Sequence, residues 1–287
     1  MIRKNLEKQG KLEEILKKEE ELRDASMEEK KKAFHEIHDM IGGNIKLFIS
    51  GAAALDANIE ERYRLLGINI VQGYGLTETS PVVAVGTNKE SRIGSIGKAV
   101  PSVEVKLVDV NQEGIGELIV KGPSVALGYY NDEENTKASF VDGWFYTGDL
   151  AKIDEEGYIF ICGRKKSVIV LKNGKNIFPE EMESLVNKIE GVKEAFIFGK
   201  QQTDDKDNIK INVEIVFDRE IVEKVYKVKT DEEIYKAISE KVKELNSKLP
   251  QYKAIRGMIL TEEPLIKTTT NKIKRQENLD AINKLKN

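Results

Sequence analysis

The sequence predicts an α/β protein of two domains, and three observations predict it. Between residues 44 and 71 an apolar run, a helical stretch and a second apolar run follow one another, as in a β–α–β unit. From residue 94 to 161 the chain changes to short alternating runs separated by turns, as in a small antiparallel barrel. From residue 165 helical and strand patterns mix over a length typical of one small domain. A chain of 287 residues is long enough for about two domains.

The first domain, residues 1–164, is expected to begin with helices. Residues 1–40 are rich in Lys and Glu and carry apolar residues at helical spacing, which predicts two charged helices with a break at Asp24–Ser26. Asp24 or Ser26 can cap the second helix. In the next part, residues 41–90, we expect a strand at 45–49, a helix at 55–66 and a strand at 68–71, with the strands parallel.

The sequence also predicts the elements of the barrel and of the second domain. The barrel, residues 91–164, should contain strands at 103–108, 117–120 and 158–161. The boundary of the second domain, residues 165–287, falls near Lys165–Lys166. That domain should contain helices at 179–189 and 231–249, strands at 192–198, 209–217 and 258–260, and a basic helix at its end.

Composition excludes several classes of protein. The chain has 46 basic and 49 acidic residues, and this near balance argues against a nucleic-acid surface. Its single cysteine, Cys162, cannot form an internal disulfide and is expected to be an apolar filler at a strand end. His35 and His38 fall in one helix, where we expect both to be solvated, and they are too few for a three-histidine metal site.

Targeting signals are not evident in the sequence. No apolar run approaches the length needed to cross a bilayer. A charged segment follows Met1, where a secretory signal peptide would have an apolar stretch. We therefore expect a cytoplasmic protein.

The most informative segment is Gly73–Pro81, which follows the second expected strand. Glycines at 73 and 75 let the backbone approach a ligand closely, and Tyr74 between them can lay its ring against a planar base. Thr77 offers a hydroxyl to a phosphate, and Glu78 offers oxygen ligands to Mg²⁺. The alternative is a turn with incidental polar residues.

A second segment, residues 142–150, contains an acidic residue that could bind a sugar. Asp149 follows Thr-Gly, so we expect its carboxylate at a tight turn where it can accept from a ribose diol. An Asx-turn that only stabilises the loop is the alternative. Trp144 and Phe145 are expected to be core residues.

Basic residues mark two further segments. Residues 163–167 and 172–180 include Arg164, suited to phosphate or ribose oxygens, and the hairpin signal Asn173–Gly174. Residues 267–275 place Lys272 on an expected turn. Alone, these segments could equally be a solvated linker and a basic tail.

Taken in this order, the four segments resemble motifs of the AMP-forming acyl-CoA synthetase (adenylate-forming enzyme) superfamily. Gly73–Pro81 is similar to its Tyr-Gly-x-Thr-Glu motif, Gly143–Asp149 to its Trp-x-x-Thr-Gly-Asp motif, Gly163–Lys166 to its hinge motif and Thr270–Lys272 to its Thr-Gly-Lys motif. Residues 48–56 and 172–181 are most similar to long-chain fatty acid–CoA ligases. The resemblance implies the end of a large adenylate-forming domain, followed by a small mobile α+β C-terminal domain.

The resemblance also implies a reaction and its substrates. A fatty acid and ATP would give an acyl-adenylate and pyrophosphate, with Mg²⁺ as cofactor, and coenzyme A would then displace AMP. Glycines 73 and 75 belong to the nucleotide motif, and Gly51, Ala52 and Ala53 would line the adenine and acyl pocket. Tyr74 would stack on adenine, Thr77 would bind the α-phosphate, and Glu78 would bind Mg²⁺.

The remaining roles also come from the resemblance. Asp149 would hold the ribose with help from Arg164. Lys272 would bridge the attacking carboxylate and the α-phosphate. The small domain would pivot at Lys166, and the Gly174 loop would shape the pantetheine tunnel. Peripheral membrane contact and oligomeric state stay open.

Two departures from the superfamily pattern stand out. Asn271 occupies the place of the usual glycine before Lys272, and asparagine tolerates left-handed backbone. Nothing before Ile70 resembles the Ser/Thr/Gly-rich phosphate loop that ends in Pro-Lys-Gly. We therefore expect the C-terminal half of such an enzyme, weak or inactive alone. Alternatives are another acid–CoA ligase or adenylation domain, and a non-catalytic module that binds nucleotide or coenzyme A.

Overall fold

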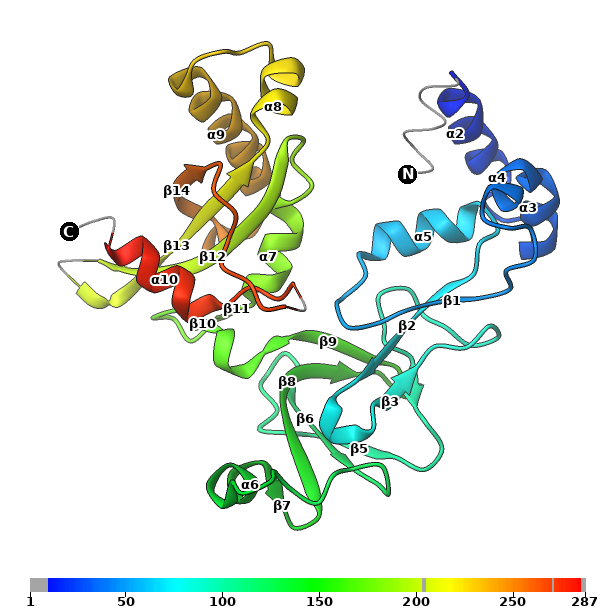
Figure 1. The fold of residues 1–287 in the computed structure, drawn as a ribbon, viewed down its shortest axis with the longest axis vertical. Helices are drawn as coiled ribbons and strands as arrows, with labels where there is room; N and C mark the ends of the chain where they lie inside the picture. The colour runs from blue at the N-terminus through cyan, green and yellow to red at the C-terminus, as the bar shows by residue number, and fades with distance from the viewer. Residues whose placement is uncertain (1–9, 203–204, 270, 285–287) are drawn as a thin grey trace. The chain divides into compact units, whose positions relative to one another are not determined.

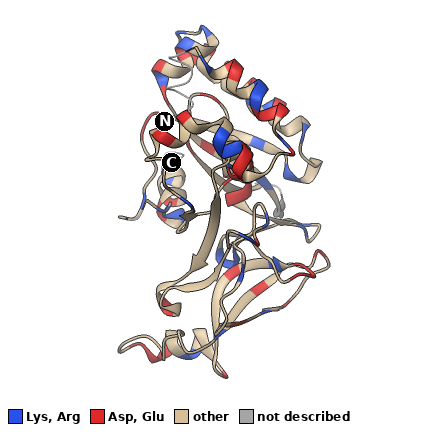
Figure 2. Cartoon of the chain, turned by 90° about the vertical axis from the view of Figure 1, so that its right-hand side faces the viewer, with Lys and Arg blue, Asp and Glu red and all other residues tan. Residues whose placement is uncertain are grey.

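The structure is a computed structural model that describes residues 10–202, 205–269 and 271–284 (Figure 1). The chain forms two compact units, Met1–Ile161 and Cys162–Asn287, which we describe separately. Within each, basic and acidic residues are interspersed along the described elements (Figure 2). Among the described helices, none combines the length and the apolar character that crossing a membrane requires.

The first unit opens with helices α2 (Leu12–Glu21), α3 (Met27–Ala33) and α4 (His35–Met40). Ser26 caps α3 in a capping box with Glu29. The second helix expected from the sequence is therefore two short helices, separated at Phe34, which is buried with Ile37, Leu66 and Ile68.

One expectation about the histidines was wrong. His35 is exposed, but His38 is only 5% exposed and its Nε2 lies 2.9 Å from the carbonyl oxygen of Leu66. His38 follows the buried Phe34 by four residues, so the two side chains share the inward helical face. The charged composition of this segment masked that face.

The expected β–α–β unit is present. Strand β1 (Phe48–Ser50), helix α5 (Ala57–Leu65) and strand β2 (Ile70–Gly75) follow in order, and β1 pairs with β2 in parallel. Strands β3 (Val82–Val85) and β4 (Lys98–Ala99) extend this sheet in the order β1–β2–β3–β4. Because β2 runs to Gly75, the glycine-rich motif begins inside the strand.

The rest of this unit is the expected small β-structure. Its main elements are β5 (Glu104–Val108), β6 (Gly116–Lys121), α6 (Glu133–Ser139), β7 (Phe140–Val141), β8 (Trp144–Ile153) and β9 (Ile159–Arg164). The sheet order is β5–β6–β8–β7, with β9 also on β8. Phe145 is buried as expected, whereas Trp144 is half-buried with the Lys106 Nζ 4.1 Å from its ring centroid. Cys162, expected at a strand end, is half-buried and lies inside β9.

The second unit is a three-stranded sheet with helices on both faces. Its elements include the one-turn 3₁₀ helices η2 (Lys165–Ser167) and η3 (Gln251–Lys253). A short hairpin comes first, made of β10 (Ile169–Val170) and β11 (Asn176–Ile177). The sheet follows, made of β12 (Val192–Gln202), β13 (Asp205–Phe217) and β14 (Ile255–Thr261). The helices are α7 (Pro179–Val186), α8 (Arg219–Tyr226), α9 (Asp231–Ser247) and α10 (Arg275–Lys284).

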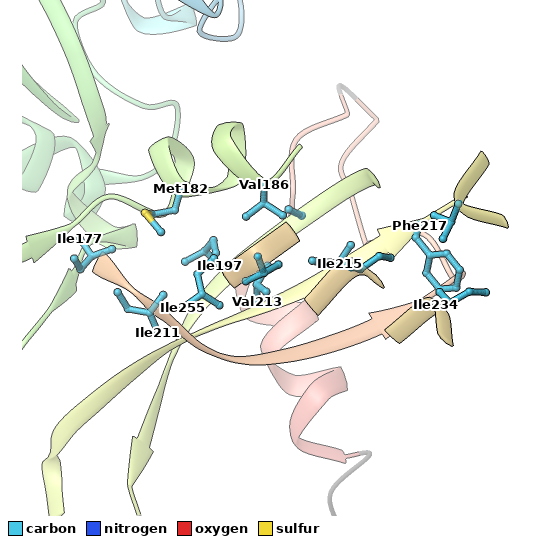
Figure 3. Packing of buried hydrophobic residues seen from close by; sticks show 14 residues of the cluster. Ile177, Met182, Val186, Ile197, Ile211, Val213, Ile215, Phe217, Ile234 and Ile255 are labelled. Atoms are coloured by element: carbon cyan, nitrogen blue, oxygen red, sulfur yellow. The ribbon is translucent and has the colours of Figure 1, made fainter. Parts of the chain in front are cut away.

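Alternation along β12 explains this layering. Ala195 and Ile197 belong to one core cluster. Figure 3 shows Ile197 in this core with Met182 of α7 and Ile234 of α9. Phe196 and Phe198 face a second cluster that contains Ile282 of α10. The basic tail helix is thus a structural layer of this unit. Helix α8 was not expected from the sequence.

Candidate functional site

The carboxyl ends of the parallel strands bring two predicted segments together. A Cβ built on Gly51 would lie 3.5 Å from the carbonyl oxygen of Gly73, so the segment Gly51–Ala53 borders the glycine-rich motif. A Cβ built on Gly75 would lie 1.6 Å from the carbonyl oxygen of Pro81. Only glycine fits there, because the chain folds back on itself at this point.

The turn after β2 is held by a residue that the sequence did not single out. Thr77–Thr79 forms a single turn of 3₁₀ helix, η1, and Thr79 is fully buried. Its hydroxyl accepts from the Leu76 amide at 3.0 Å and lies 2.7 Å from the Pro81 carbonyl oxygen. Thr77 remains exposed and Glu78 is half-buried on the same turn. Thr79 fixes the turn, which leaves the hydroxyl of Thr77 accessible to a ligand.

Glu78 is held from a distant loop. The Tyr129 hydroxyl donates to Glu78 Oε1 at 2.9 Å, and the Ala126 amide donates to the Glu78 carbonyl at 2.8 Å. Burial and the hydrogen bond to Glu78 both raise the pKa of Tyr129. The Tyr129 ring also meets Phe140 edge-on at 5.5 Å. No motif marked Tyr129 in the sequence, because its partner lies 51 residues away.

The position of Asp149 corrects the sequence analysis. Asp149 does not lie at a tight turn but inside β8, where residues 147–149 bulge between two stretches that pair with β6. Gly148 takes φ +71° there and its amide donates to Glu117 Oε1 at 3.1 Å. Thr-Gly suggested a turn, but strand pairing on both sides makes it a bulge, which redirects a side chain. Asp149 is only 5% exposed.

The bulge joins Asp149 to the glycine-rich motif. The Tyr74 hydroxyl donates to Asp149 Oδ2 at 2.5 Å, across 75 residues of sequence. Thr147 supports this arrangement, since its hydroxyl bonds the Leu118 carbonyl at 2.7 Å and accepts from the Asp149 amide at 3.0 Å. The predicted base-stacking and ribose-binding residues are thus direct neighbours.

The second unit carries the other predicted residues. Arg164 ends β9 and Lys166 lies in η2, both exposed. Asn173–Gly174 forms the predicted turn between β10 and β11, with Gly174 at φ +74° and the Leu171 amide 3.0 Å from the Lys175 carbonyl oxygen.

Lys272 lies on a closed turn. The Thr268 amide donates to the Lys272 carbonyl at 2.8 Å, and the Asn271 amide donates to the Thr268 carbonyl at 2.9 Å. Asn271 takes φ +67°, so it adopts the left-handed backbone that a glycine would supply. The Lys272 side chain is exposed. Thr270 of the predicted motif is outside the described residues.

The acidic side chains of the site indicate which metal ion it could bind. Within the described ranges, no three His, Cys, Asp or Glu side chains gather in a way that could hold a metal ion. Glu78 is a single half-buried carboxylate beside an exposed hydroxyl. Such a set fits Mg²⁺, which proteins bind through one or two carboxylates together with substrate phosphates.

Two family models match the chain. AMP-binding enzyme matches residues 12–130, and AMP-binding enzyme C-terminal domain matches residues 166–284. The chain therefore belongs to the AMP-binding, adenylate-forming enzymes, whose members include acid–CoA ligases.

Similar proteins agree on the class but differ in the acid they are named for. The chain is 39% identical over 166 residues to long-chain-fatty-acid–CoA ligase FadD15 of Mycobacterium bovis, covering 58% of this chain and 27% of that protein. It is 39% identical over 165 residues to 2-succinylbenzoate–CoA ligase of Listeria monocytogenes, covering 57% and 34%. The structure of O-succinylbenzoate coenzyme A synthetase from Bacillus subtilis with ATP and magnesium ion matches with a TM-score of 0.67 at 28% identity, covering 82% and 46%. The chain thus spans 27% and 34% of these two curated relatives.

Proposed function

We propose that this protein acts in an AMP-forming acid–CoA ligase reaction, with long-chain fatty acids as the acid. The acid carboxylate attacks the α-phosphorus of ATP and pyrophosphate leaves. The thiol of coenzyme A, after losing its proton, attacks the acyl carbon and AMP leaves. The observation that carries this proposal is the Tyr74–Asp149 hydrogen bond at the ends of the parallel strands, with Glu78 on the adjoining turn.

Each unit has its own part in this proposal. In residues 1–164, the Tyr74 ring packs the adenine, Asp149 accepts from the ribose hydroxyls, and Thr77 donates to the α-phosphate. Glu78 would hold Mg²⁺, which neutralises phosphate charge when bound. These groups act by position and charge rather than by acid–base chemistry.

Arg164 and the residues that follow it, 165–287, supply cations and a hinge. Arg164 assists at the ribose, and Lys272 neutralises charge as the carboxylate and α-phosphate meet. Lys166 is the pivot about which this domain turns, and the Gly174 turn shapes the path of the pantetheine arm. The one-turn 3₁₀ helix at 165–167 follows the end of β9, and residues at the ends of elements commonly serve as hinges.

The nature of the acid has a second candidate. The chain is 39% identical both to a 2-succinylbenzoate–CoA ligase and to a long-chain-fatty-acid–CoA ligase. An aromatic or dicarboxylic acid is therefore the alternative substrate, and the residues that would select between the acids are not identified by these matches.

A binding assay tests the nucleotide site directly. Titration of the purified chain with AMP should show binding that Asp149→Ala weakens about 10- to 100-fold, since a buried charged acceptor is lost. Glu134→Ala, which removes an exposed carboxylate of α6, is the control and should bind AMP normally. Absence of AMP binding by the unmodified chain would refute the proposed nucleotide site.

A product assay tests the chemistry. The chain is incubated with Mg-ATP, coenzyme A and either palmitate, 2-succinylbenzoate or anthranilate, and acyl-CoA and AMP are measured by mass spectrometry. Because the chain spans only 27% and 34% of two curated relatives, we expect little or no palmitoyl-CoA from it alone, and any product should be lost in Lys272→Ala with AMP binding retained. Product from an aromatic acid alone would favour the second candidate. AMP binding that is lost in Asp149→Ala, without product from any acid, would support half of such a ligase that keeps part of its nucleotide site.

A further inference from the structure

An arginine anchors the carboxyl end of the turn that carries Lys272. Arg275 begins α10 and donates through both terminal nitrogens to Glu183 of α7, Nη1 to Oε1 at 2.9 Å and Nη2 to Oε2 at 2.8 Å. Its Nη2 also lies 3.1 Å from Glu180, and its Nη1 is 3.4 Å from the Ile197 carbonyl oxygen. A two-pronged contact of this kind fixes the orientation of the guanidinium as well as its position.

The acceptor of this contact is built into the core of the unit. Glu183 is 7% exposed and Oε1 also accepts from the Ile197 amide at 2.9 Å, which ties α7 to β12. Burial raises the pKa of Glu183, and the hydrogen bond from Arg275 opposes that rise. The Arg275 guanidinium also lies 5.7 Å from the Phe196 ring centroid. Since the paired carboxylate cannot move without leaving the core, Arg275 is held in one place.

The amino-terminal end of the turn has its own anchor. Lys267 forms an ion pair with Glu194 of β12, and the Leu265 amide donates to the same carboxylate at 3.1 Å. Lys267 also pairs with Ile273 as an antiparallel bridge. The described residues between these anchors therefore belong to a short hairpin, in which Lys272 is exposed.

We propose that Arg275 is a positioning residue for Lys272, and that its two-pronged contact with Glu183 sets the position of the backbone from which the lysine side chain extends. The proposal rests on the proposed function for the role of Lys272. Only two residues separate them, a path of at most about 10 Å, so movement of Arg275 must move the turn. In a reaction that depends on placement, an error of about 1 Å can cost about 100-fold in rate.

Hydrogen exchange tests the positioning without any catalysis. Arg275→Lys keeps the positive charge beside Glu183 but cannot make the fork. We expect the amides of Lys272 and Lys274, which donate to Thr268 Oγ1 and the Ile266 carbonyl, to exchange about tenfold faster than in the unmodified chain.

The matched control is another arginine of the same unit. Arg219→Lys breaks a comparable contact, since Arg219 donates to Glu262 at 2.7 Å and to Asp231 at 2.8 Å. This variant should leave the exchange rates of the Lys272 and Lys274 amides unchanged. If Arg275→Lys unfolds the unit, Glu183→Gln replaces it, because the amide keeps one acceptor oxygen for the guanidinium and cannot complete the two-pronged contact. Unchanged exchange at Lys272 and Lys274 in the folded variant would overturn the proposal.

A second measurement links position to chemistry. In a preparation that makes acyl-adenylate, Arg275→Lys should slow that step about tenfold or more and leave thioester formation from added acyl-adenylate unchanged. Equal loss of both steps would indicate a merely structural role and contradict the proposal. If the unmodified chain neither binds AMP nor makes acyl-adenylate, the proposed function fails, and the exchange result still decides whether Arg275 holds the turn.

Discussion

The Gly73–Glu78 segment and the Lys272 turn are held in opposite ways. In the first, the side chains that we propose contact the nucleotide and its metal are themselves hydrogen-bonded: Tyr74 to Asp149, and Glu78 to Tyr129. In the second, the bonds lie at the base of the turn, and the lysine that the motif predicts as functional is exposed at its tip.

The two regions therefore differ in which atoms are already ordered before a ligand binds. Side chains already bound to neighbours lose little freedom when a nucleotide arrives, which lowers the entropic cost of binding. An exposed lysine keeps its rotamers, and only the path of its backbone is fixed in advance. Substitutions of the residues that anchor the Lys272 turn should therefore disturb that turn and not the Gly73–Glu78 segment. Substitutions of the residues that hold the Gly73–Glu78 segment should disturb that segment and not the turn.

The largest expected effect breaks the anchor of the lysine turn. Arg275→Met leaves Glu183 buried without its cation and should destabilise the second unit by about 3 kcal/mol. Trp144 is the single tryptophan of the chain and lies in the first unit, so its fluorescence reports that unit alone. In urea, the circular dichroism transition should move to lower concentration while the Trp144 transition stays in place.

Two outcomes of that experiment would count against this comparison. A circular dichroism transition that does not move would show that the contact between Arg275 and Glu183 contributes little to the stability of the second unit. A Trp144 transition that moves equally would show that the two units unfold together. Arg219→Met, whose partners are exposed, is the control and should have a smaller effect.

The next effect concerns the tyrosine of the first region. Tyr74→Phe removes the donor to a buried carboxylate and should cost about 2 kcal/mol, now visible in the Trp144 transition. Tyr130→Phe is the control, because Tyr130 is 93% exposed. If both variants unfold alike, Asp149 does not depend on Tyr74, and the idea of a pre-formed nucleotide site loses its main support.

Much of this architecture could be predicted from local patterns. Parallel β1 and β2, the Asn173–Gly174 hairpin and the left-handed Asn271 all follow from residues close in sequence. The bulge at Asp149 could not, because it depends on where β6 pairs with β8. Tyr129 and Arg275 were missed for a similar reason, since each acts on a carboxylate 51 or 92 residues away.

A smaller effect tests whether Tyr129 prepares Glu78 for a metal. Tyr129→Phe should weaken Mg-ATP binding about fivefold, the value of one ordinary hydrogen bond, because Glu78 would then have to be ordered on binding. AMP binding without Mg²⁺ should be unaffected. Equal weakening for both ligands would mean that Tyr129 supports the turn as a whole rather than the carboxylate.

The smallest effect compares the helix caps of the two units. Ser26 and Thr230 each form a capping box, with Glu29 and Glu233, and both carboxyl groups have a lowered pKa. For Glu29 the main cause is the Ser26 hydroxyl, and for Glu233 it is the Lys229 amide. Either alanine variant should lose about 1 kcal/mol, Ser26→Ala in the Trp144 transition and Thr230→Ala in circular dichroism.

The pH dependence of these caps has a definite sign. A pKa lowered by folding stabilises the protein above the ordinary glutamate value of about 4.3, and this contribution is lost as the pH falls through the folded-state value. The difference in melting temperature between the unmodified chain and Glu233→Gln should therefore be largest at neutral pH and shrink below about pH 4. A difference that persists or grows in acid would show that the Glu233 charge does not support α9, and would leave the Thr230 hydroxyl as the main stabilising group of that cap.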